Sequence, residues 1–495
     1  MDEVGATYQC RPARGIDHVS APVETPGASM TFMMTQGWVV AALAASLPLL
    51  VSAHAGRAPL RHQSLARVLH VDGNAATRPA DGFASIRDAV IVAQPGDTIR
   101  VAAGTYAERL VTVRGGLTDA PIVITGDPQA RAILQVPGRV ATITHPHVRI
   151  EHLVLDGEFG TDDAVRVGSE AHHLVLRDVE VRRAGRDCID MGSPTNVLIE
   201  DALVHSCLNA AGGRTDAHGI VAGAARNLTI RRTEVHTFSG DGIQLDPSRS
   251  TPGWTDVRIE SCRFWLEPLR EPANGFPAGT VPGENALDTK TPTTGDRARI
   301  TVVDTTASGF GGGLIRNMAA FNLKERIDAV LDGVTVRDSD IGFRVRGPAD
   351  TGAAVTIRNA VVHDVATAVR YEDDIDPLRI HHMTIGSGVT RVFQRAAAPA
   401  AHVEVRNMLV LGTTLPPEAA GQGLAVDARA FRNAAAHDYH LTPGSEAIDR
   451  GSRVADVTVD RDGQPRSHAG GPDLGAYEYC SSCAPSVPKG LRRRR

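Results

Sequence analysis

Acidic residues, a histidine and a lysine occupy matching places in a series of short segments in the middle of the chain. The residues that directly follow the central aliphatic residue of each segment are Arg166, Asp190, Val221, Gln244, Asp288, Arg344 and Arg370. Asp187, His218 and Asp241 each precede a small residue, and Asp246 and Lys290 lie two places beyond the first series. Strands that stack in a sheet lie about 4.8 Å apart. If these segments stack in register, their polar side chains meet on one face.

This face would concentrate negative charge, and a cation would relieve it. Carboxylates a few ångströms apart raise one another's pKa values. Ca²⁺ accepts several oxygen ligands in flexible geometry, which suits carboxylates from neighbouring segments. We therefore predict a Ca²⁺ ion held by Asp190, Asp241, Glu284 and Asp288. The alternative is a solvated acidic patch that forms salt bridges to arginines.

Lysine is rare in this chain, because only Lys290, Lys324 and Lys489 occur among 52 basic residues. A lysine beside a metal ion and arginines loses its proton more readily and can act as a base. In uronic acids a base removes the proton at C5 once the adjacent carboxylate is neutralised, and the C4 oxygen then leaves. We predict that Lys290 is this base. The alternative is an ordinary salt bridge from Lys290 to Asp246 or Asp288.

Other residues of the same face are predicted to assist. Arg316 and Arg344 are expected to act with Lys290 in catalysis. The predicted substrate-binding residues are Asp187, His218, Gln244, Asp246 and Arg346. The predicted partner is an acidic polysaccharide, and the chain is expected to act as a monomer.

The elements that must position these residues recur along the chain. Equivalent apolar residues of successive β-branched segments are Ile150, Leu176, Ile199, Ile230, Ile259, Ile300, Leu331, Ile357, Ile380 and Val405. Units of about 20–30 residues, with alternating strands and no amphipathic helix between them, are typical of a β-solenoid. In such a fold the inward residues of each strand build a continuous core, and the outward residues form columns along the surface.

The N-terminal end of the repeat carries a predicted cap. Phe83, Ile86, Ala89, Val90 and Ala93 share one face of a short helix. This helix would cover the open end of the hydrophobic core. Uncovered coil edges would otherwise invite aggregation.

The helix and the segment PGDTIRVAAGTY at 95–106 resemble the opening of the pectin lyase-like superfamily. The segment YHLTPGSEAIDRGS at 439–452 is similar to the C-terminal closure of its secreted bacterial members. The resemblance covers roughly residues 68–479. It implies an all-β fold, a single-stranded right-handed parallel β-helix (β-solenoid) with an N-terminal capping helix.

Two shorter segments resemble β-helical polysaccharide lyases. Glu284–Lys290 is similar to the glutamate-to-lysine segment of lyases acting on alginate and chondroitin-type chains, in which the glutamate binds Ca²⁺ and the lysine is the base. Gly240–Leu245 is similar to the paired-aspartate coil of calcium-dependent family-nine pectate lyases, with Gly240 and Gln244 in place of two acids. The resemblance implies β-elimination in a pectate-like or alginate-like polysaccharide.

Three other functions stay open on the same fold. Asp216-Ala217-His218 resembles a segment of mannuronan-type C5-epimerases, which share the first half of the chemistry. A glycoside hydrolase would need a close acid pair, to which Asp241 and Asp246 could contribute. The non-enzymatic alternative is a secreted adhesin-like or carbohydrate-binding β-helix. An unsaturated product that absorbs in the near ultraviolet would distinguish a lyase from all three.

The first residues carry a predicted export signal. An apolar run at 37–51 is short for a membrane span, and it is followed by a small-x-small pattern at 53–55. We expect a secreted or periplasmic protein without stable membrane insertion after cleavage; a single membrane anchor is the alternative. The predicted divisions are a leader and signal peptide at 1–55, the β-helix at 68–435, a closing segment at 436–479 and a flexible basic tail at 480–495.

Charge and cysteine content narrow the possible partners. The 57 acidic and 52 basic residues among 495 give a net charge of −5, which offers no electrostatic case for nucleic acid as the main partner.

Export would permit disulfides, and Cys480 and Cys483 are expected to form a local one.

Overall fold

The computed structural model describes residues 66–210, 216–347, 352–372, 375–396, 402–466 and 470–481. The predicted leader and most of the predicted basic tail lie outside these residues. The described residues all belong to one compact unit of the chain, Gln63–Arg495. Within the described part, no helix has the length and apolar character needed to span a membrane.

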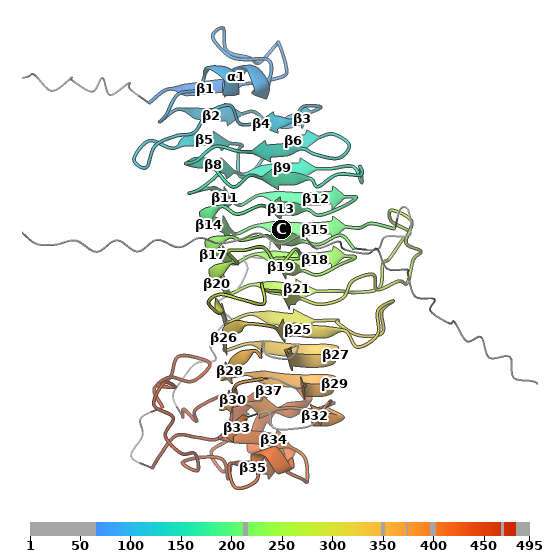
Figure 1. Ribbon diagram of the computed structural model, residues 1–495, viewed down its shortest axis with the longest axis vertical. Helices are drawn as coiled ribbons and strands as arrows, with labels where there is room; N and C mark the ends of the chain where they lie inside the picture. The colour runs from blue at the N-terminus through green and yellow to red at the C-terminus, as the bar shows by residue number, and fades with distance from the viewer. Residues whose placement is uncertain are drawn as a thin grey trace, which may run out of the picture. The chain divides into compact units, whose positions relative to one another are not determined.

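The chain winds as a parallel β-helix, as predicted, and each coil adds one strand to a first sheet (Figure 1). The thirteen strands of this sheet in the described residues are β1 (Val68–Val71), β2 (Thr98–Val101), β5 (Ile122–Thr125), β8 (Val148–Glu151), β11 (Val175–Arg177), β14 (Thr195–Glu200), β17 (Arg226–Arg231), β20 (Thr255–Glu260), β23 (Ala298–Val303), β26 (Ile327–Asp332), β28 (Ala354–Arg358), β30 (Leu378–His381) and β33 (Val403–Arg406). Every pair of neighbours that these strands form is parallel.

The remaining parallel strands form a second sheet, which bends within each coil and so contains two rows. The first row is β3 (Gly104–Tyr106), β6 (Ala132–Gln135), β9 (Leu153–Asp156), β12 (Glu180–Ala184), β15 (Leu203–Cys207), β18 (Glu234–Phe238), β21 (Arg263–Trp265), β24 (Thr306–Ser308), β31 (Thr384–Ile385), β34 (Met408–Leu411) and β35 (Gly423–Val426). The second row is β4 (Leu110–Val111), β7 (Ala141–Ile143), β10 (Val165–Val167), β13 (Ile189–Met191), β16 (Ile220–Ala222), β19 (Ile243–Leu245), β22 (Leu287–Thr289), β25 (Ala319–Lys324) and β32 (Arg391–Arg395). Two long strands, β27 (Thr335–Arg346) and β29 (Val361–Tyr371), run through both rows.

The predicted column of apolar residues forms the core of the first sheet, with one error of register. Ile150, Leu176, Ile199, Ile230 and Ile259 stack in consecutive coils and are buried. The next partner of Ile259 is Val302, whereas the predicted Ile300 pairs with Val257. Strand side chains alternate with a period of two residues, so this slip of two leaves an inward residue inward.

The predicted N-terminal cap is present as α1 (Ile86–Val92). Ser85 caps this helix by accepting a hydrogen bond from the Asp88 backbone N–H at 3.1 Å. Ile86, Ala89 and Val90 are buried, and they join the same core as the first strands. The helix therefore closes the end of the core, as its apolar face predicted.

A second, smaller core lies beside the main one and includes Val361 of β29 and Leu409 of β34. The antiparallel pair β36 (Phe431–Asn433) and β37 (Asp438–Leu441) contributes Phe431 and Tyr439 to this core. Three short 3-10 helices lie along the same stretch of chain, at Pro417–Ala419, Ala428–Ala430 and Ala434–Ala436.

Shortening one core residue tests how tightly the coils depend on one another. Ile230 is fully buried on β17, between Ile199 and Ile259 of the neighbouring coils. We expect Ile230→Ala to lower the free energy of unfolding by about 2–5 kcal/mol, because it leaves a cavity that two coils line. Urea unfolding measures this loss. Thr229→Ala on the same strand is the control and should cost less than about 1 kcal/mol; an equal loss in both variants would contradict the inward assignment.

Candidate active site

The predicted outward column exists, and one of its strands, β25, was missed. Strand pairing aligns Arg166 of β10, Asp190 of β13, Val221 of β16, Gln244 of β19 and Asp288 of β22 in consecutive coils. The column continues through β25, where Asn322 stands between Asp288 and Arg344. Arg344 and Arg346 therefore lie two coils beyond Asp288 and Lys290.

A second column runs beside the first, three residues earlier in each coil. The pairing registers align Asp163, Asp187, His218, Asp241 and Asn285. Glu284 was predicted to share a calcium ion with Asp241, but Asn285 occupies that row and Glu284 precedes it. Glu284 lies in the segment that leads into β22 and is not part of a strand.

Asp241 is the buried centre of a hydrogen-bond network. Its Oδ1 accepts a hydrogen bond from the Asn285 side-chain amide at 2.7 Å, and its Oδ2 accepts one from the Gln244 amide at 2.9 Å. The Asp241 backbone N–H donates to Nδ1 of His218 at 2.7 Å. Burial raises the pKa of Asp241 and lowers the pKa of His218. Both oxygens of Asp241 are thus already engaged by neighbouring side chains.

Two lysines converge on Asp288. Lys324 Nζ lies 2.8 Å from Asp288 Oδ1, and Lys290 Nζ lies 3.6 Å from Asp288 Oδ2. The Asn322 side-chain amide also donates to Oδ1, at 2.8 Å. Burial and the charge of Asp241 raise the pKa of Asp288 to about 6, although Lys324 opposes the shift. The salt bridge from Lys290 to Asp288 that the sequence left open is therefore formed.

Lys324 has no role in the sequence-based prediction, although the sequence contains a signal for it. Residues 286–290 read Ala-Leu-Asp-Thr-Lys, and residues 320–324 read Ala-Phe-Asn-Leu-Lys. The two segments match in length and in the places of the Asp or Asn and of the Lys, and they pair directly as β22 and β25. Aligning them would have revealed the additional strand.

Glu284 belongs electrostatically to the same group. Burial raises its pKa to about 7, and the nearby charges of Asp241, Asp216 and Asp288 add to the rise, while Lys290 opposes it. A carboxyl group that titrates near neutral pH can donate and accept protons there. We call the set formed by Asp241, Glu284, Asp288, Lys290 and Lys324 the lysine–carboxylate group.

The remaining predicted residues lie apart from this group. Asp246 is fully buried at a turn, where its Oδ1 accepts a hydrogen bond from the Ser250 backbone N–H at 2.8 Å. Arg344 pairs with Glu372 at 3.0 Å, and Arg316 is exposed in the loop before β25. Within the described residues, no hydrogen bond or ion pair joins Arg316, Arg344 or Arg346 to the lysine–carboxylate group.

Three carboxylates do come together, but they differ from the predicted set. Single oxygens of Asp163, Asp187 and Asp190 all lie within 4.8 Å of one another, and the three residues are buried. Asp190 was predicted as a metal ligand and Asp187 as a substrate-binding residue, whereas Asp163 was missed. The predicted partners Asp241, Glu284 and Asp288 lie outside every group of at least three such ligands in the described chain.

The Asp163 side chain points to a cation at this acidic cluster. Neither of its carboxylate oxygens has a hydrogen-bond partner, although the residue is about 1% exposed. Arg186 Nε lies 3.4 Å from its Oδ1, Arg139 and Arg166 lie 3.8 and 3.9 Å from its Oδ2, and Arg166 also forms an ion pair with Asp190. The salt bridges to arginines that the sequence left open are therefore formed. Because carboxylate oxygens are the ligands that Ca²⁺ prefers, the three aspartates are also a candidate metal cluster.

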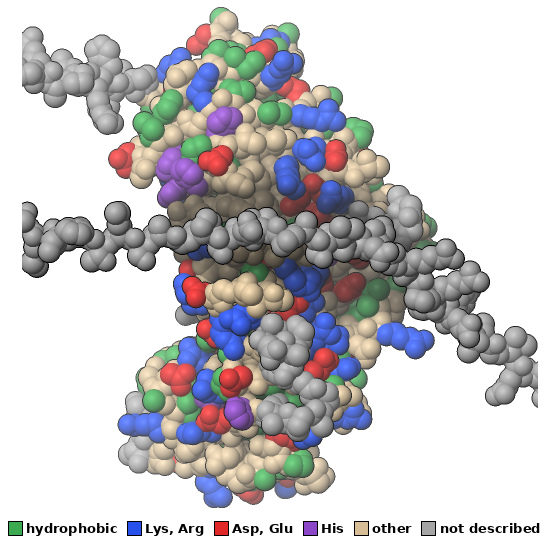
Figure 2. Space-filling view, in the orientation of Figure 1, with side chains coloured by type: hydrophobic (Ala, Val, Ile, Leu, Met, Phe, Trp, Pro, Cys, Tyr) green, Lys and Arg blue, Asp and Glu red, His purple; other side chains and the backbone are tan. Residues whose placement is uncertain are grey.

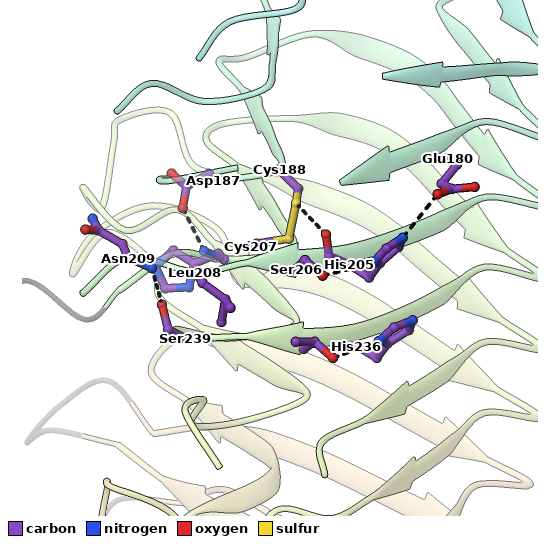
Figure 3. The surroundings of a disulfide bond; sticks show 12 residues. Glu180, Asp187, Cys188, His205, Ser206, Cys207, Leu208, Asn209, His236 and Ser239 are labelled. Carbon is purple, nitrogen blue, oxygen red and sulfur yellow. Dashed lines mark hydrogen bonds and ion pairs between the residues drawn. A yellow bond between two sulfur atoms is a disulfide. The ribbon is translucent and has the colours of Figure 1, made fainter. Parts of the chain in front are cut away.

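A disulfide bond fixes the chain beside this acidic cluster (Figure 3). Cys188 follows Asp187 directly and is bonded to Cys207 of the next coil. The Asp187 carboxylate accepts a hydrogen bond from the His218 backbone N–H at 2.8 Å. Of the other cysteines in the described chain, Cys262 is buried and free, and Cys480 is disulfide-bonded. Cys483, its predicted partner, lies outside the described residues.

Known proteins resemble this chain in fold. No protein-family model matches the chain, and no curated protein matches it by sequence. Similar solved structures include the pectate lyase Pel9A, with 13% identity, a TM-score of 0.47 and coverage of 84% of this chain and 96% of that one. An alginate lyase from Paenibacillus sp. str. FPU-7 has 14% identity, a TM-score of 0.42 and coverage of 69% and 99%. A family 28 exopolygalacturonase of Yersinia enterocolitica has 14% identity, a TM-score of 0.42 and coverage of 73% and 79%. At these values the likeness carries no argument about the chemistry of this chain.

Calcium should stabilise the protein through the acidic cluster. A ligand that binds only the folded state raises the melting temperature. We expect this rise when calcium is added to chelator-treated protein, and we expect Asp163→Asn to abolish it. Thermal denaturation with and without calcium measures the effect. Asp162→Asn is the matched control, because the neighbouring Asp162 side chain is 57% exposed and outside the cluster. An equal calcium response in all three proteins would contradict the site.

The raised pKa of Glu284 predicts a pH dependence of stability. The folded-state pKa of about 7 lies above the ordinary value of 4.5, so the folded state holds the proton more tightly than the unfolded state does. This contribution is fully present below about pH 4.5 and is lost as the pH rises to about 7. We expect Glu284→Gln to make the fall of unfolding free energy between these pH values shallower.

Urea unfolding at several pH values checks this expectation. Glu267→Gln, in the segment between β21 and β22 that also contains Glu284, is the control and should keep the wild-type slope. Asp288 also has a raised pKa, so part of the fall should remain in Glu284→Gln. A slope unchanged by Glu284→Gln would show that this carboxyl group titrates normally.

Proposed function

We propose that this protein is an exported polysaccharide lyase that cleaves uronic-acid-containing chains by β-elimination, with Lys290 as the base. The observation that carries the proposal is the convergence of Lys290 and Lys324 on Asp288, amid carboxyl groups of raised pKa. Two of the three lysines in the whole chain thus lie at one site.

The two lysines are not equivalent. Lys324 is closer to Asp288, and its side chain is 9% exposed, whereas that of Lys290 is 20% exposed. One carboxylate cannot neutralise two ammonium groups, and the shorter contact assigns it to Lys324. Lys290 is therefore the lysine that can reach a bound sugar and exchange its proton.

The reaction needs a base, a positive charge and an acid. Lys290 takes the proton from C5 of the uronic acid, the C4–O bond breaks, and a C4=C5 double bond forms. Positive charge near the sugar carboxylate makes the C5 proton removable, and Lys324 supplies it on the coil after Lys290. Glu284, with a pKa of about 7, is partly protonated at neutral pH and can donate the proton that the leaving oxygen requires.

Calcium takes a different place from the one predicted beside Lys290. Asp163, Asp187 and Asp190 would hold it, and there it would supply a positive charge that attracts a second uronate of the same polysaccharide. Asp190 and Asp288 are three coils apart in their column, about 14 Å at 4.8 Å per coil. The charge needed at C5 is therefore assigned to the lysines.

A glycoside hydrolase is the second candidate. Its support is the pair of Glu284 and Asp288, whose pKa values are raised to about 7 and about 6. A hydrolase needs one protonated and one ionised carboxyl group across the glycosidic bond. Incubation with pectate, alginate and glycosaminoglycans, with and without calcium, separates the candidates, because a lyase forms an unsaturated product and a hydrolase does not.

Replacing the proposed base tests the mechanism. Lys290→Arg keeps the positive charge near Asp288, but a guanidinium group does not deprotonate in a protein. We expect a loss of about 10²–10⁴-fold in the rate of unsaturated product formation, the usual contribution of general base catalysis. The assay is near-ultraviolet absorbance on the best substrate of the panel.

A matched exchange on the first sheet serves as the control. Arg258→Lys on β20 exchanges the same two residue types on a strand outside the rows that carry the lysines. It should retain wild-type turnover. Near-normal product formation by Lys290→Arg would refute the role of Lys290, and reducing-end formation without an unsaturated product would favour the hydrolase.

A further inference from the structure

Three histidines meet on the surface in the turns that precede β8 and β11. His147 lies directly before β8, and His172 and His173 lie shortly before β11. One ring nitrogen of each lies within 4.8 Å of the others, and Nδ1 of His172 lies 2.8 Å from Nδ1 of His173. The rings of His147 and His173 stack with centroids 4.6 Å apart. Figure 2 shows histidine side chains gathered at the edge of the molecule over these strands.

The backbone brings these turns together but does not require His172. His147 and His173 occupy one column, which continues with Asn196 and Asn227, and all four have a positive φ between 53° and 57°. Asn and His are both tolerated in that left-handed conformation, so either residue would satisfy the turn. His172 lies outside the set of described residues with positive φ. Its imidazole is therefore an addition to the column and not a consequence of the backbone conformation.

The ligand set of the three histidines suits a transition metal such as Zn²⁺ or Cu²⁺. No carboxylate belongs to this group, so it lacks the oxygen ligands that Ca²⁺ and Mg²⁺ prefer. Neutral imidazoles suit Zn²⁺ and Cu²⁺. Two nitrogens bound to a tetrahedral zinc ion lie about 3.3 Å apart, given Zn–N distances of about 2.0–2.1 Å. Small side-chain rotations bring the observed nitrogens to that spacing.

The coil on the far side of His173 supplies an outer partner. The side-chain amide of Asn196 lies 3.3 Å from Nε2 of His173, and Asn227 donates to Oδ1 of Asn196 at 2.9 Å. An amide nitrogen only donates hydrogen bonds, so Nε2 of His173 is the acceptor and its ring proton lies on Nδ1, beside Nδ1 of His172. Coordination of His173 therefore replaces either this proton or the Asn196 hydrogen bond.

We propose that His147, His172 and His173 form a surface site for a divalent transition metal of the Zn²⁺ and Cu²⁺ class. The ion joins two consecutive coils through their turns, with at least one coordination position open to water or to a ligand. This site is separate from the acidic cluster and from the lysine–carboxylate group, and it holds whether or not the chain is a lyase.

Calorimetric titration of ZnCl₂ into untagged, chelator-treated full-length protein tests the proposal. The variant His172→Asn/His173→Asn should bind one Zn²⁺ fewer per chain than the wild type. Binding of zinc should also raise the melting temperature of the wild type, but not of the double variant.

A second histidine pair provides the matched control. His363 and His437 lie with Asp364 in another group of potential ligands, so His363→Asn/His437→Asn removes the same number of imidazoles elsewhere. This variant should keep the zinc ion assigned to His147, His172 and His173. If the double variant fails to fold, His172→Asn alone makes the measurement, because its position has no positive φ. Absence of zinc binding by the wild type, or loss of the ion only in the His363 and His437 variant, would overturn the proposal.

Discussion

The parallel register of the coils is the constraint on which the rest of the structure depends. Each residue lies directly above its counterpart in the previous coil, so a charged residue repeated at one position meets its own kind about 4.8 Å away. The column that contains Asp288 avoids this repulsion, because its residues from Arg166 to Asn322 are Arg, Asp, Val, Gln, Asp and Asn. Where two arginines do follow one another, Arg344 and Arg370, both lie against Glu372. Opposite or neutral neighbours thus stabilise a stack that would otherwise repel itself.

The neighbouring column breaks that pattern at one place, where arginines supply the opposite charge. Asp163 and Asp187 follow each other directly, and Asp190 lies beside them. Burial raises the pKa of Asp187, and the charge of Asp163 raises it further. Two coils later Asp241 is also buried, but it is surrounded by hydrogen-bond donors. An aspartate can therefore be a candidate metal ligand in one coil and the centre of a hydrogen-bond network in another, depending on the residues of the neighbouring coils.

The sequence could predict the columns but not the contacts between them. Alternation of apolar residues is enough to fold the strands and to place Asp190, Gln244 and Asp288 in one row, because a period of two leaves only one inward face. Strand β25 was missed because its first residues follow a glycine-rich stretch, and so its apolar pattern is short. Which carboxylates share a cation depends on side-chain directions and on arginine pairing. The prediction therefore named Asp241, Glu284 and Asp288 as ligands beside Asp190 and omitted Asp163.

The two polar centres lie in different coils. Asp190 and Asp288 are three coils apart, about 14 Å, whereas Asp187 and Asp241 are two coils apart, about 10 Å. The main causes of the raised pKa of Glu284 and of Asp288 nevertheless lie outside the acidic cluster. Their raised pKa values arise from their own burial and from Asp241, and these causes remain whether or not a cation binds upstream. On such a fold, the calcium site and the catalytic base that we propose need not share a ligand, because each occupies its own coils of the stack.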